Sequence, residues 1–394
     1  MKQGWEIKKL GDCFDYIRNG ANIKQERGAG GIPITRIETL SGGIFNRNRL
    51  GYADIKDADK YKSHVLESED LLLSHINSKT YIGRTVVYIK EGNEIIIHGM
   101  NLLRLKAIRS IISPFFMYYY SLSEMFGKQI ANRRKDAVNQ SSISVGDLKT
   151  VLIPVPSLAE QERIVAELDC LSSVIEKQKE LLKELDNLAQ STFYTMFGDP
   201  ITNEKGWEVK TFGGEFEISS GGTPSTSNKQ YWENGNISWI GSNMCQNTII
   251  YENDGKYITA LGLEKSSAKL YEEDYVLVAL VGATIGKTAL LKKRTTTNQN
   301  IAGINVPKNK EYNSVFVFHL LQGLYCLFED IGGDKFKMAN LGFVRSLPLM
   351  SPPINLQQEF ASKIEAIEKQ KELIKQSIAE TETLFNSRMD YYFN

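Results

Sequence analysis

The sequence predicts a mixed α/β (α+β) chain, with two globular domains in a tandem pseudo-repeat and one long helix after each domain. Three observations predict this architecture. Sequence motifs recur after about 200 residues, each copy contains an apolar strand, a turn and a second apolar strand, and two long segments lack glycine and proline, which is typical of helices. With 394 residues, 42% of them hydrophobic and 24% charged, the chain is long enough for about two or three domains with cores of their own.

The repeat begins with the motif Gly-Trp-Glu, which opens each half of the chain. An apolar segment entered from a glycine turn follows, and we expect it to be a strand in both copies. A buried strand, a turn and a second strand come next. Since the order of these features is the same in both copies, we infer one fold used twice. The matching segments are 4–8 and 206–210, 31–37 and 235–240, and 70–85 and 274–288.

Two long helices are expected within residues 154–200 and 351–394, because each segment contains over thirty consecutive residues without glycine or proline. Apolar residues alternate there at spacings of four and three, which forms a heptad seam that needs a partner helix. We expect the two helices to form an antiparallel coiled coil; the alternative is two amphipathic helices packed separately on their own domains. The seams are Ile164, Leu168, Leu171, Ile175, Gln178, Leu182, Leu185 and Ala189, and Phe360, Ile364, Ile367, Lys371, Ile374, Ile378, Thr381 and Phe385.

The predicted globular domains, residues 1–153 and 201–350, differ in charge. The whole chain is neutral, with 47 basic and 47 acidic side chains. Residues 1–153 carry 23 basic and 16 acidic side chains, a net charge of +7, and residues 201–350 carry 15 of each, while the helical segments 154–200 and 351–394 stand at −5 and −2. The basic first domain favours a nucleic-acid partner, and the neutral second domain is the main observation against one.

Membrane, metal and disulfide chemistry are not expected from this sequence. No apolar run approaches the ~18 residues of a membrane helix, and the first residues lack an apolar signal segment, so we expect a cytoplasmic protein without membrane contact. The four cysteines lie far apart, and the four histidines do not combine with carboxylates at metal-ligand spacing. We therefore expect neither a metal site nor a cofactor.

Two motifs that would indicate catalysis are incomplete or missing. Residues 282–288 resemble a phosphate-binding loop, but three residues rather than four separate the glycines, and the flanks are predicted strands. An Asn-Pro-Pro-Tyr or Asp-Pro-Pro-Tyr segment, which would hold a flipped adenine, is absent from the sequence; the nearest segment, 112–116, lacks the amide. We expect a protein that is not itself an enzyme.

Candidate nucleic-acid contacts combine cations, amides and small-residue loops. A loop at 219–225 leads to Lys229, and residues 18–24 occupy the same place in the first domain. Such a loop could approach a phosphate backbone, although turn chemistry explains its glycines equally well. Three adjacent cations at 133–135 lie beside two amides; arginine can bond guanine, and asparagine or glutamine can bond adenine. The alternative is a solvated helix face.

The candidates are distributed over both domains. In the first domain they are Arg18, Lys24, Thr35, Arg36, His75, Lys79, Arg84, Arg133, Arg134, Lys135, Asn139 and Gln140. In the second they are Thr223, Ser225, Lys229, Ser242, Asn243, Thr284, Lys287, Asn298, Gln299, Asn300, Lys335 and Lys337. His75, like His98, can read a base edge or be a satisfied interior residue, and Arg84 and Lys287, at matching turns, are phosphate contacts or ordinary hairpin cations.

Taken in order, the motifs resemble the specificity subunit of a Type I restriction-modification system over nearly the whole chain. The motifs concerned are the Gly-Trp-Glu openings, Gly221-Gly222-Thr223-Pro224 ahead of Tyr231-Trp232, the segment 237–240, the turn 285–287, the amides 298–300, and prolines followed by glutamine before each long helix. Each motif alone is weak, but their order, found twice, is specific. The first domain departs from the pattern, because it lacks the Gly-Gly-Thr-Pro loop and has His98-Gly99-Met100-Asn101 in place of the amides.

The resemblance implies two target recognition domains, residues 1–153 and 201–350, that each read one half of a bipartite double-stranded DNA sequence. The helices within 154–200 and 351–394, the family's conserved spacer regions, would fix the gap between the halves. The implied partners are two modification subunits, which methylate adenine, and restriction subunits, which translocate and cleave DNA, so that the chain itself is non-catalytic. The alternative from another class is a structural scaffold whose helices bind proteins and whose globular halves bind peptides or glycans.

Overall fold

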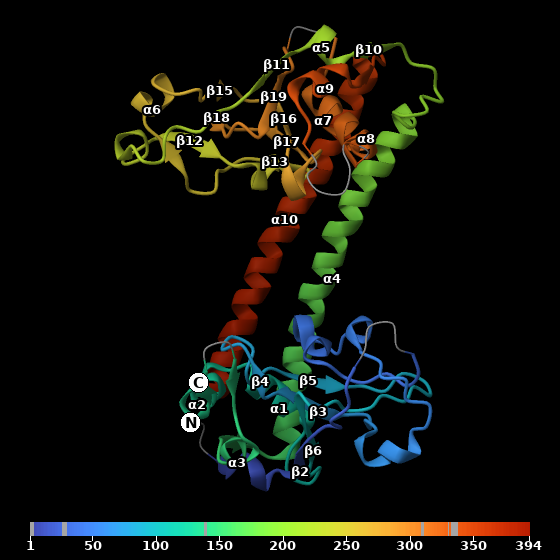
Figure 1. Ribbon diagram of the computed structural model, residues 1–394, viewed down its shortest axis with the longest axis vertical. Coiled ribbons are helices and arrows are strands. Elements are labelled where there is room, and N and C mark those ends of the chain that lie inside the picture. Colours follow the sequence, from blue (N-terminus) through green and yellow to red (C-terminus); the bar gives the residue numbers. More distant parts are fainter. Residues whose placement is uncertain (1–3, 26–29, 138–139, 309–310, 330, 332–337) are drawn as a thin grey trace. The chain divides into compact units, whose positions relative to one another are not determined.

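Buried apolar segments of the sequence form the central strands of two sheets, one in each half of the chain. The computed structural model (Figure 1) describes residues 4–25, 30–137, 140–308, 311–329, 331 and 338–394. The chain divides into two units: Met1–Lys179 with Gln376–Asn394 form unit 1, and Glu180–Lys375 form unit 2. Each unit has its own large hydrophobic core.

The central sheet of unit 1 is antiparallel, with strand order β2-β6-β3-β5. Its strand β3 carries Leu71, Leu72 and Leu73, which are all fully buried because both faces of the sheet are covered. Leu71 and Leu73 pack in the same cluster as α1 (Pro114–Ser121), and Leu72 packs in a second cluster with Leu66 on the other face. The strands are β2 (Phe14–Asn19), β3 (Asp70–Ser74), β5 (Thr85–Tyr88) and β6 (Leu102–Ala107).

Shorter elements complete unit 1. Strand β1 pairs with β9, and β8 pairs with both β4 and β7, all antiparallel. Ser123 and Ser144 begin α2 and α3, each by accepting a hydrogen bond from a backbone N–H of the first turn. The elements are β1 (Glu6–Lys9), β4 (Ile76–Asn77), β7 (Lys135–Asp136), β8 (Ser141–Ser142), β9 (Leu152–Val155), α2 (Glu124–Arg133), α3 (Val145–Lys149), and the 3-10 helices η1 (Leu10–Asp12), η2 (Ile37–Gly43), η3 (Arg47–Arg49) and η4 (Asp59–His64).

Unit 2 repeats the central sheet with the order β11-β19-β16-β17, and β13 is added in parallel to β17. The register is also repeated, since Leu71 pairs with Leu105 in unit 1 as Val276 pairs with Ile304 in unit 2. This residue-by-residue correspondence confirms the predicted pseudo-repeat. The strands are β11 (Glu217–Ser220), β13 (Thr248–Ile250), β16 (Val276–Ala279), β17 (Thr288–Leu291) and β19 (Ile301–Asn305).

The remaining elements of unit 2 are a second sheet, one strand pair and a set of short helices. The second sheet has the order β14-β12-β18-β15, and β10 pairs with β20 as β1 pairs with β9 in unit 1. The elements are β10 (Val209–Thr211), β12 (Ile237–Ile240), β14 (Tyr257–Ile258), β15 (Leu270–Tyr271), β18 (Thr295–Thr297), β20 (Pro348–Met350), α5 (Phe212–Glu215), α6 (Ala260–Glu264), α7 (Ser314–Gly323), α8 (Tyr325–Glu329), α9 (Leu341–Ser346), η5 (Lys229–Tyr231), η6 (Ser242–Met244) and η7 (Gly282–Thr284).

Two helices of 40 residues each contribute to both units, α4 (Leu158–Phe197) and α10 (Ile354–Phe393). In unit 1 the start of α4 packs against the end of α10. Gln178 donates to the hydroxyl of Ser377 at 2.7 Å, and Arg388 pairs with Glu167. Residue numbers rise on one helix as they fall on the other, so the helices are antiparallel there.

The same pairing is found in unit 2, where the end of α4 meets the start of α10. Nζ of Lys371 lies 2.7 Å from Oδ1 of Asp186. Lys371 is a polar position of the predicted seam, and this ion pair accounts for its place there. Every predicted seam residue is buried or half-buried. The predicted antiparallel pairing is therefore confirmed within each unit.

The predicted strand at 31–37 is wrong. Residues there form isolated bridges, such as that of Ile34 with Ile97, whereas Ile237–Ile240 is strand β12 with a partner on each side. Pro33 has no N–H to donate to a neighbouring strand, so the segment of the first copy cannot continue a ladder.

Candidate nucleic-acid interface

The loops at one end of each central sheet bring together many of the predicted contact residues. In unit 2 they are the loop that leaves β11 after Ser220, the loop from Ala279 of β16 to β17, and the short segment between β18 and β19. In unit 1 they are the loop that leaves β2 after Asn19, the segment from Ser74 of β3 through β4 to β5, and the segment that precedes β6. Because strand order and direction are the same, the two sets of loops are equivalent. We call each set the loop end of its unit.

The glycines of the first loop allow close packing of the backbone. A Cβ atom at Gly221 would lie 2.1 Å from Oγ1 of Thr297, and one at Gly20 would lie 2.3 Å from the carbonyl oxygen of Gly99. Both distances are far below van der Waals contact, so neither position accepts a side chain. The loop backbone is thus held against the segment that precedes β19 or β6. Packing explains these glycines without a ligand.

Amide and hydroxyl side chains gather at the loop end of unit 2. The hydroxyl of Thr223 donates to Oε1 of Gln299 at 2.7 Å. Oδ1 of Asn298 accepts from the backbone N–H of Asn300 at 3.1 Å, and the backbone N–H of Asn298 donates to the carbonyl of Ile240 at 3.1 Å. Gln299 is exposed and Asn298 and Asn300 are half-buried. Three predicted amides therefore lie in one segment, and one of them, Gln299, accepts a hydrogen bond from Thr223 of the loop after β11.

A cation directly precedes strand β5 at the loop end of unit 1 and strand β17 at the loop end of unit 2. Lys287, ahead of β17, donates from Nζ to Oε1 of Gln246 at 2.8 Å. Arg84, ahead of β5, is exposed, with its guanidinium carbon 4.1 Å from the centre of the Tyr81 ring. The register of the sheets makes Arg84 and Lys287 equivalent. The two units thus present a cation from the same point of the fold, supported by different neighbours.

A carboxylate gathers two further predicted cations in unit 1. Oδ2 of Asp136 lies 3.0 Å from Nζ of Lys79, and Oδ1 lies 3.0 Å from Nε of Arg134. The hydroxyl of Ser141 also donates to Oδ1, at 2.6 Å. Hydrogen bonds from Ser141 and Lys79 lower the pKa of Asp136. The charged carboxylate therefore holds Lys79 and Arg134 next to each other beside strand β8.

Some predicted contacts are engaged inside unit 1. Thr35 is 1% exposed, and its hydroxyl oxygen accepts from the N–H of Gly99 at 2.9 Å. His75 is 7% exposed, and burial lowers its pKa to about 4. Nε of Arg133 donates to the hydroxyl of Thr150 at 2.9 Å. Thr35 and His75 therefore support the structure around the loop end, and Arg133 fastens the end of α2 to the segment before β9.

The other predicted contacts are spread over the surfaces of their units. Lys24, Arg36, Lys135, Gln140, Ser225, Lys229 and Asn243 are exposed, and Ser242 and Thr284 are half-buried. Asn139, Lys335 and Lys337 lie outside the described residues.

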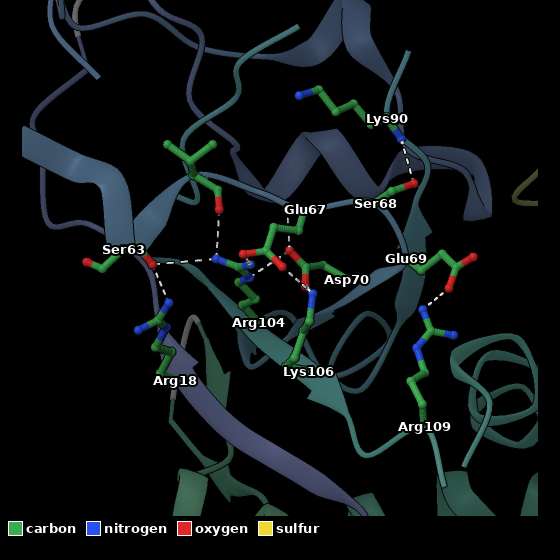
Figure 2. A network of polar contacts seen from close by, with 11 residues as sticks. Arg18, Ser63, Glu67, Ser68, Glu69, Asp70, Lys90, Arg104, Lys106 and Arg109 are labelled. Atoms are coloured by element: carbon green, nitrogen blue, oxygen red, sulfur yellow. Dashed lines mark hydrogen bonds and ion pairs between the residues drawn. The ribbon is translucent and has the colours of Figure 1, made fainter. Parts of the chain in front are cut away.

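Sequence reasoning missed a buried ion pair on one face of the unit 1 sheet (Figure 2). Arg104 of β6 and Asp70 of β3 are 1% and 0% exposed, and Nε of the first lies 2.7 Å from Oδ2 of the second. Arg104 also donates to the carbonyl of Val65 at 2.8 Å. Burial raises the pKa of Asp70, while the backbone N–H of Glu67 and the charge of Arg104 oppose the rise.

The ion pair belongs to a wider network that fastens the segment before β3 to the sheet (Figure 2). Arg18 donates to the carbonyl of Ser63, and Lys106 pairs with Glu67. Arg18, a predicted contact, is therefore a member of this network and not of the loop end. The sequence signal was a cation inside the apolar run 102–105, which does not indicate its partners.

Neither a metal site nor a membrane span was found in the described part of the chain. Within it, no three histidine, cysteine or acidic side chains are grouped so that they could hold a metal ion. None of its helices combines the length and the apolar character needed to cross a membrane.

Comparison with known proteins shows the family. Residues 2–187 and 204–383 match the family described as the Type I restriction modification DNA specificity domain. The chain belongs to this family. Its function is DNA target recognition as the specificity subunit of a Type I restriction-modification system, and a specificity subunit is not itself catalytic. The resemblance inferred from the motifs is confirmed.

Named relatives agree with this assignment. A Methanocaldococcus jannaschii protein named as the specificity subunit of the type I restriction enzyme MjaX is 32% identical over 393 residues, which span 93% of this chain and 88% of the relative. The EcoKI specificity subunit of Escherichia coli is 25% identical over 203 residues, which span 50% of this chain and 43% of the relative.

Two solved structures share the fold. One, described as showing complex assembly and conformational transition of the type I R-M system, gives a TM-score of 0.60 at 16% identity and covers 100% of this chain and 98% of that one. The other is the S subunit of a Type-I restriction-modification system from M. genitalium, with a TM-score of 0.55 at 14% identity, covering 99% and 97% of the two chains. At such identities the likeness concerns the fold.

Proposed function

We propose that each unit of this specificity subunit reads one half of a bipartite double-stranded DNA target through its loop end. One observation carries the proposal: equivalent strands support both loop ends, but the side chains on them differ. Unit 2 presents Asn298, Gln299 and Asn300, whereas unit 1 presents Lys79 and Arg84, with Arg134 held beside Lys79 by Asp136. Amides can bond adenine and arginines can bond guanine, so two such surfaces suit two different half-sites.

The predicted contact residues are proposed to include both phosphate contacts and base contacts. Lys287 and Arg84, at equivalent positions, are proposed to grip the DNA backbone and fix the register of each unit on the duplex. Exposed cations and amides beside them, among the predicted contacts, extend the surface. The buried Thr35 and His75 then act by shaping the loops. Base readers and backbone readers differ in their salt dependence, which separates them experimentally.

The long helices are proposed as the spacer between the half-sites. In this proposal residues 1–153 and 201–350 are the recognition domains, and the segments 154–200 and 351–394 hold them apart. Each 40-residue helix spans about 60 Å at about 1.5 Å per residue. Half-sites read from one face of the duplex lie about 34 Å apart, so the helices are long enough for this role.

We further propose two modification subunits, and restriction subunits through the complex, as partners in the cytoplasm. A pseudo-repeat presents similar surfaces twice, so one modification subunit is expected at each equivalent end, near the outer helix faces and the prolines that precede the helices. Native mass spectrometry of the complex should show two modification subunits per chain; one at saturation would contradict this. Exposed charged residues on the outer faces are Glu176, Lys177, Glu180, Lys183, Glu184, Lys369 and Glu372. Glu368, expected among them, is half-buried and pairs with Lys371.

Mapping of adenine methylation tests the proposed function. The chain is expressed with its modification subunits in a host without other adenine methylation, and methylated sites are read genome-wide. We expect one bipartite motif with two specified halves and an unspecified gap of constant length. A continuous motif, or methylation that does not depend on the chain, would contradict the proposal.

A further inference from the structure

A buried glutamine stands in the first turn of each long helix. Gln161 is in α4 and Gln357 is in α10, and both are fully buried although their side chains are polar. A buried amide needs hydrogen-bond partners from the protein, because water cannot reach it. The partners show what each glutamine connects.

Gln161 joins three separate segments of unit 1. Its Oε1 accepts from the backbone N–H of Ser113 at 2.8 Å. Its Nε2 donates to the carbonyls of Ile111 at 2.9 Å and Pro156 at 3.0 Å. Ser113 is the N-cap of α1, and Pro156 directly follows β9. One side chain thus links the start of α4 to the start of α1 and to the end of the recognition domain.

Gln357 makes the same three bonds in unit 2. Its Oε1 accepts from the backbone N–H of Asn313 at 2.9 Å. Its Nε2 donates to the carbonyls of Glu311 at 3.0 Å and Pro352 at 2.8 Å. Asn313 is the N-cap of α7, the counterpart of α1. The set of three hydrogen bonds is therefore repeated although the bonded residues differ; for example, Ile111 of unit 1 corresponds to Glu311 of unit 2.

The chemistry of these sites requires glutamine. Each site supplies one backbone N–H and two carbonyl oxygens, so the side chain must accept once and donate twice. A carboxylate of the same length would accept from the N–H but would place negative charge against two carbonyls, and a methionine would satisfy none of the three groups. Asparagine is one methylene shorter.

We propose that Gln161 and Gln357 are positioning residues that set the gap length of the DNA target by fixing the angle between each recognition domain and its helix. This rests on the proposed function. An error of about 5° at the base of a helix moves a point about 20 residues along it by roughly 3 Å, at about 1.5 Å per residue. That displacement is close to one base-pair step of about 3.4 Å.

Selection from a random duplex pool tests the proposal. The full chain with its modification subunits is the probe protein, and the pool carries about 40 random base pairs. The variants are Gln161→Met and Gln357→Met, with the milder Gln161→Glu and Gln357→Glu. Wild type is expected to select one gap length. Each variant is expected to keep both half-sites. Sites whose gap is one base shorter or longer should be enriched at least tenfold more by the variant than by wild type.

Matched controls are Glu162→Met and Gln358→Met, at the exposed position that follows each glutamine. They should keep the wild-type gap. A general loss of stability lowers binding to all sites equally and leaves the ratio between gap lengths unchanged. Folded variants that keep the original gap overturn the proposal, and so does failure of both variant pairs to fold, because the glutamines would then serve folding alone. A wild-type pool without a bipartite motif would instead refute the proposed function.

Discussion

At the same position of the central sheet, unit 1 has Arg104 and unit 2 has Gly303. Arg104 pairs across the sheet with Leu72, and Gly303 pairs with the equivalent Leu277. In unit 1 the guanidinium reaches over the sheet to Asp70 and to backbone carbonyls of the preceding segment. Arg104, the largest fully buried side chain described in unit 1, thus corresponds to a glycine, Gly303, in unit 2.

Tyr271 takes the place of the arginine in unit 2. A Cβ at Gly303 would lie 2.5 Å from Cε1 of Tyr271, so the ring covers the glycine. The hydroxyl of Tyr271 donates to the carbonyl of Ser219 at 3.0 Å. In the sheet register Ser219 corresponds to Arg18, which belongs to the ionic network of unit 1. An aromatic contact and an ion pair therefore perform the same task, which is to hold a segment on this face of the sheet.

The comparison of the two units separates the constant parts of the repeat from the variable ones. Strand order, register and the glutamine bonds recur, whereas the packing behind the loop ends has been rebuilt with different chemistry. Ionic packing in unit 1 and aromatic packing in unit 2 should respond differently to mutation and to pH.

The largest expected effect is that of Arg104→Met. The substitution keeps an apolar stem but leaves the Asp70 carboxylate buried without its arginine, so the free energy of unfolding should fall by about 3–5 kcal/mol. Chemical denaturation measures it. The control is Arg109→Met, which removes an exposed partner of Glu69 and should cost at most about 1 kcal/mol. Equal losses for the two variants would show that the buried pair is not what holds this face.

In unit 2 the corresponding test is Gly303→Ala. The added methyl group would collide with the ring of Tyr271, and overpacking of this kind costs about 1–3 kcal/mol. The control is Gly127→Ala in α2, where nothing lies within 4 Å of the new Cβ; it should stabilise by up to about 1 kcal/mol. Thermal unfolding of both variants gives the comparison, and an unchanged midpoint for Gly303→Ala would mean that Tyr271 does not cover the strand tightly.

DNA binding should separate the two units. Arg84→Ala should weaken binding by unit 1 and Lys287→Ala binding by unit 2. Because both are proposed as phosphate contacts, each substitution should reduce the salt slope by about 1. Lys90→Ala and Lys293→Ala are matched controls, because these lysines follow the opposite ends of the same strands. Titrations with duplexes mutated in one half-site give the assignment. If both variants weakened the same half-site, the two loop ends would not act separately.

The smallest expected difference concerns pH. Burial lowers the pKa of His75 to about 4 and that of His98 to about 3 in unit 1, and that of His319 to about 3 in unit 2. Folded pKa values below the ordinary 6.5 mean that the stabilising neutral form is fully present above about pH 6.5 and that stability is lost as the pH falls toward 4. Between pH 6.5 and 5.5 each histidine should cost about 1 kcal/mol.

Unit 1 has two such histidines, and burial and the charge of Arg18 also lower the pKa of its His64, so unit 1 should lose at least about 1 kcal/mol more than unit 2 over that interval. Amide hydrogen exchange measures this, with Leu72 reporting on unit 1 and Leu277 on unit 2. Equal losses at the two amides would mean that burial does not keep the additional histidine neutral.

The repeat and the long helices could be predicted because they leave local signals. The paired Gly-Trp-Glu motifs, the glycine-free segments and the heptad spacing depend on neighbours in the chain. The strand at 31–37 failed because an apolar segment does not show whether a partner strand accepts it. The predicted match of Asp70 with Asp274 was also off by one residue: the sheet register makes Glu69 the counterpart of Asp274, and both have positive φ, at 69° and 68°.

The sequence could indicate which residue types are suited to contact DNA, but it could not indicate which of them lie together on one surface. Arg18 and Lys79 look alike in the sequence, yet one lies in the network of Figure 2 and the other beside Asp136. Arg104 was missed because its partners come from a segment more than thirty residues away. Long-range polar contacts of this kind depend on the finished fold, which residue type and spacing do not report.

The last turns of α10 have a consequence for synthesis on the ribosome. Met389, Tyr392 and Phe393 belong to the core of unit 1, where the ring of Phe393 lies 5.4 Å from that of Phe116. All segments of unit 2 have been made once Lys375 is added, but unit 1 lacks part of its core until residues 376–394 follow. The half that is translated first is therefore completed last, and until then its aromatic surface is exposed to aggregation or to a chaperone.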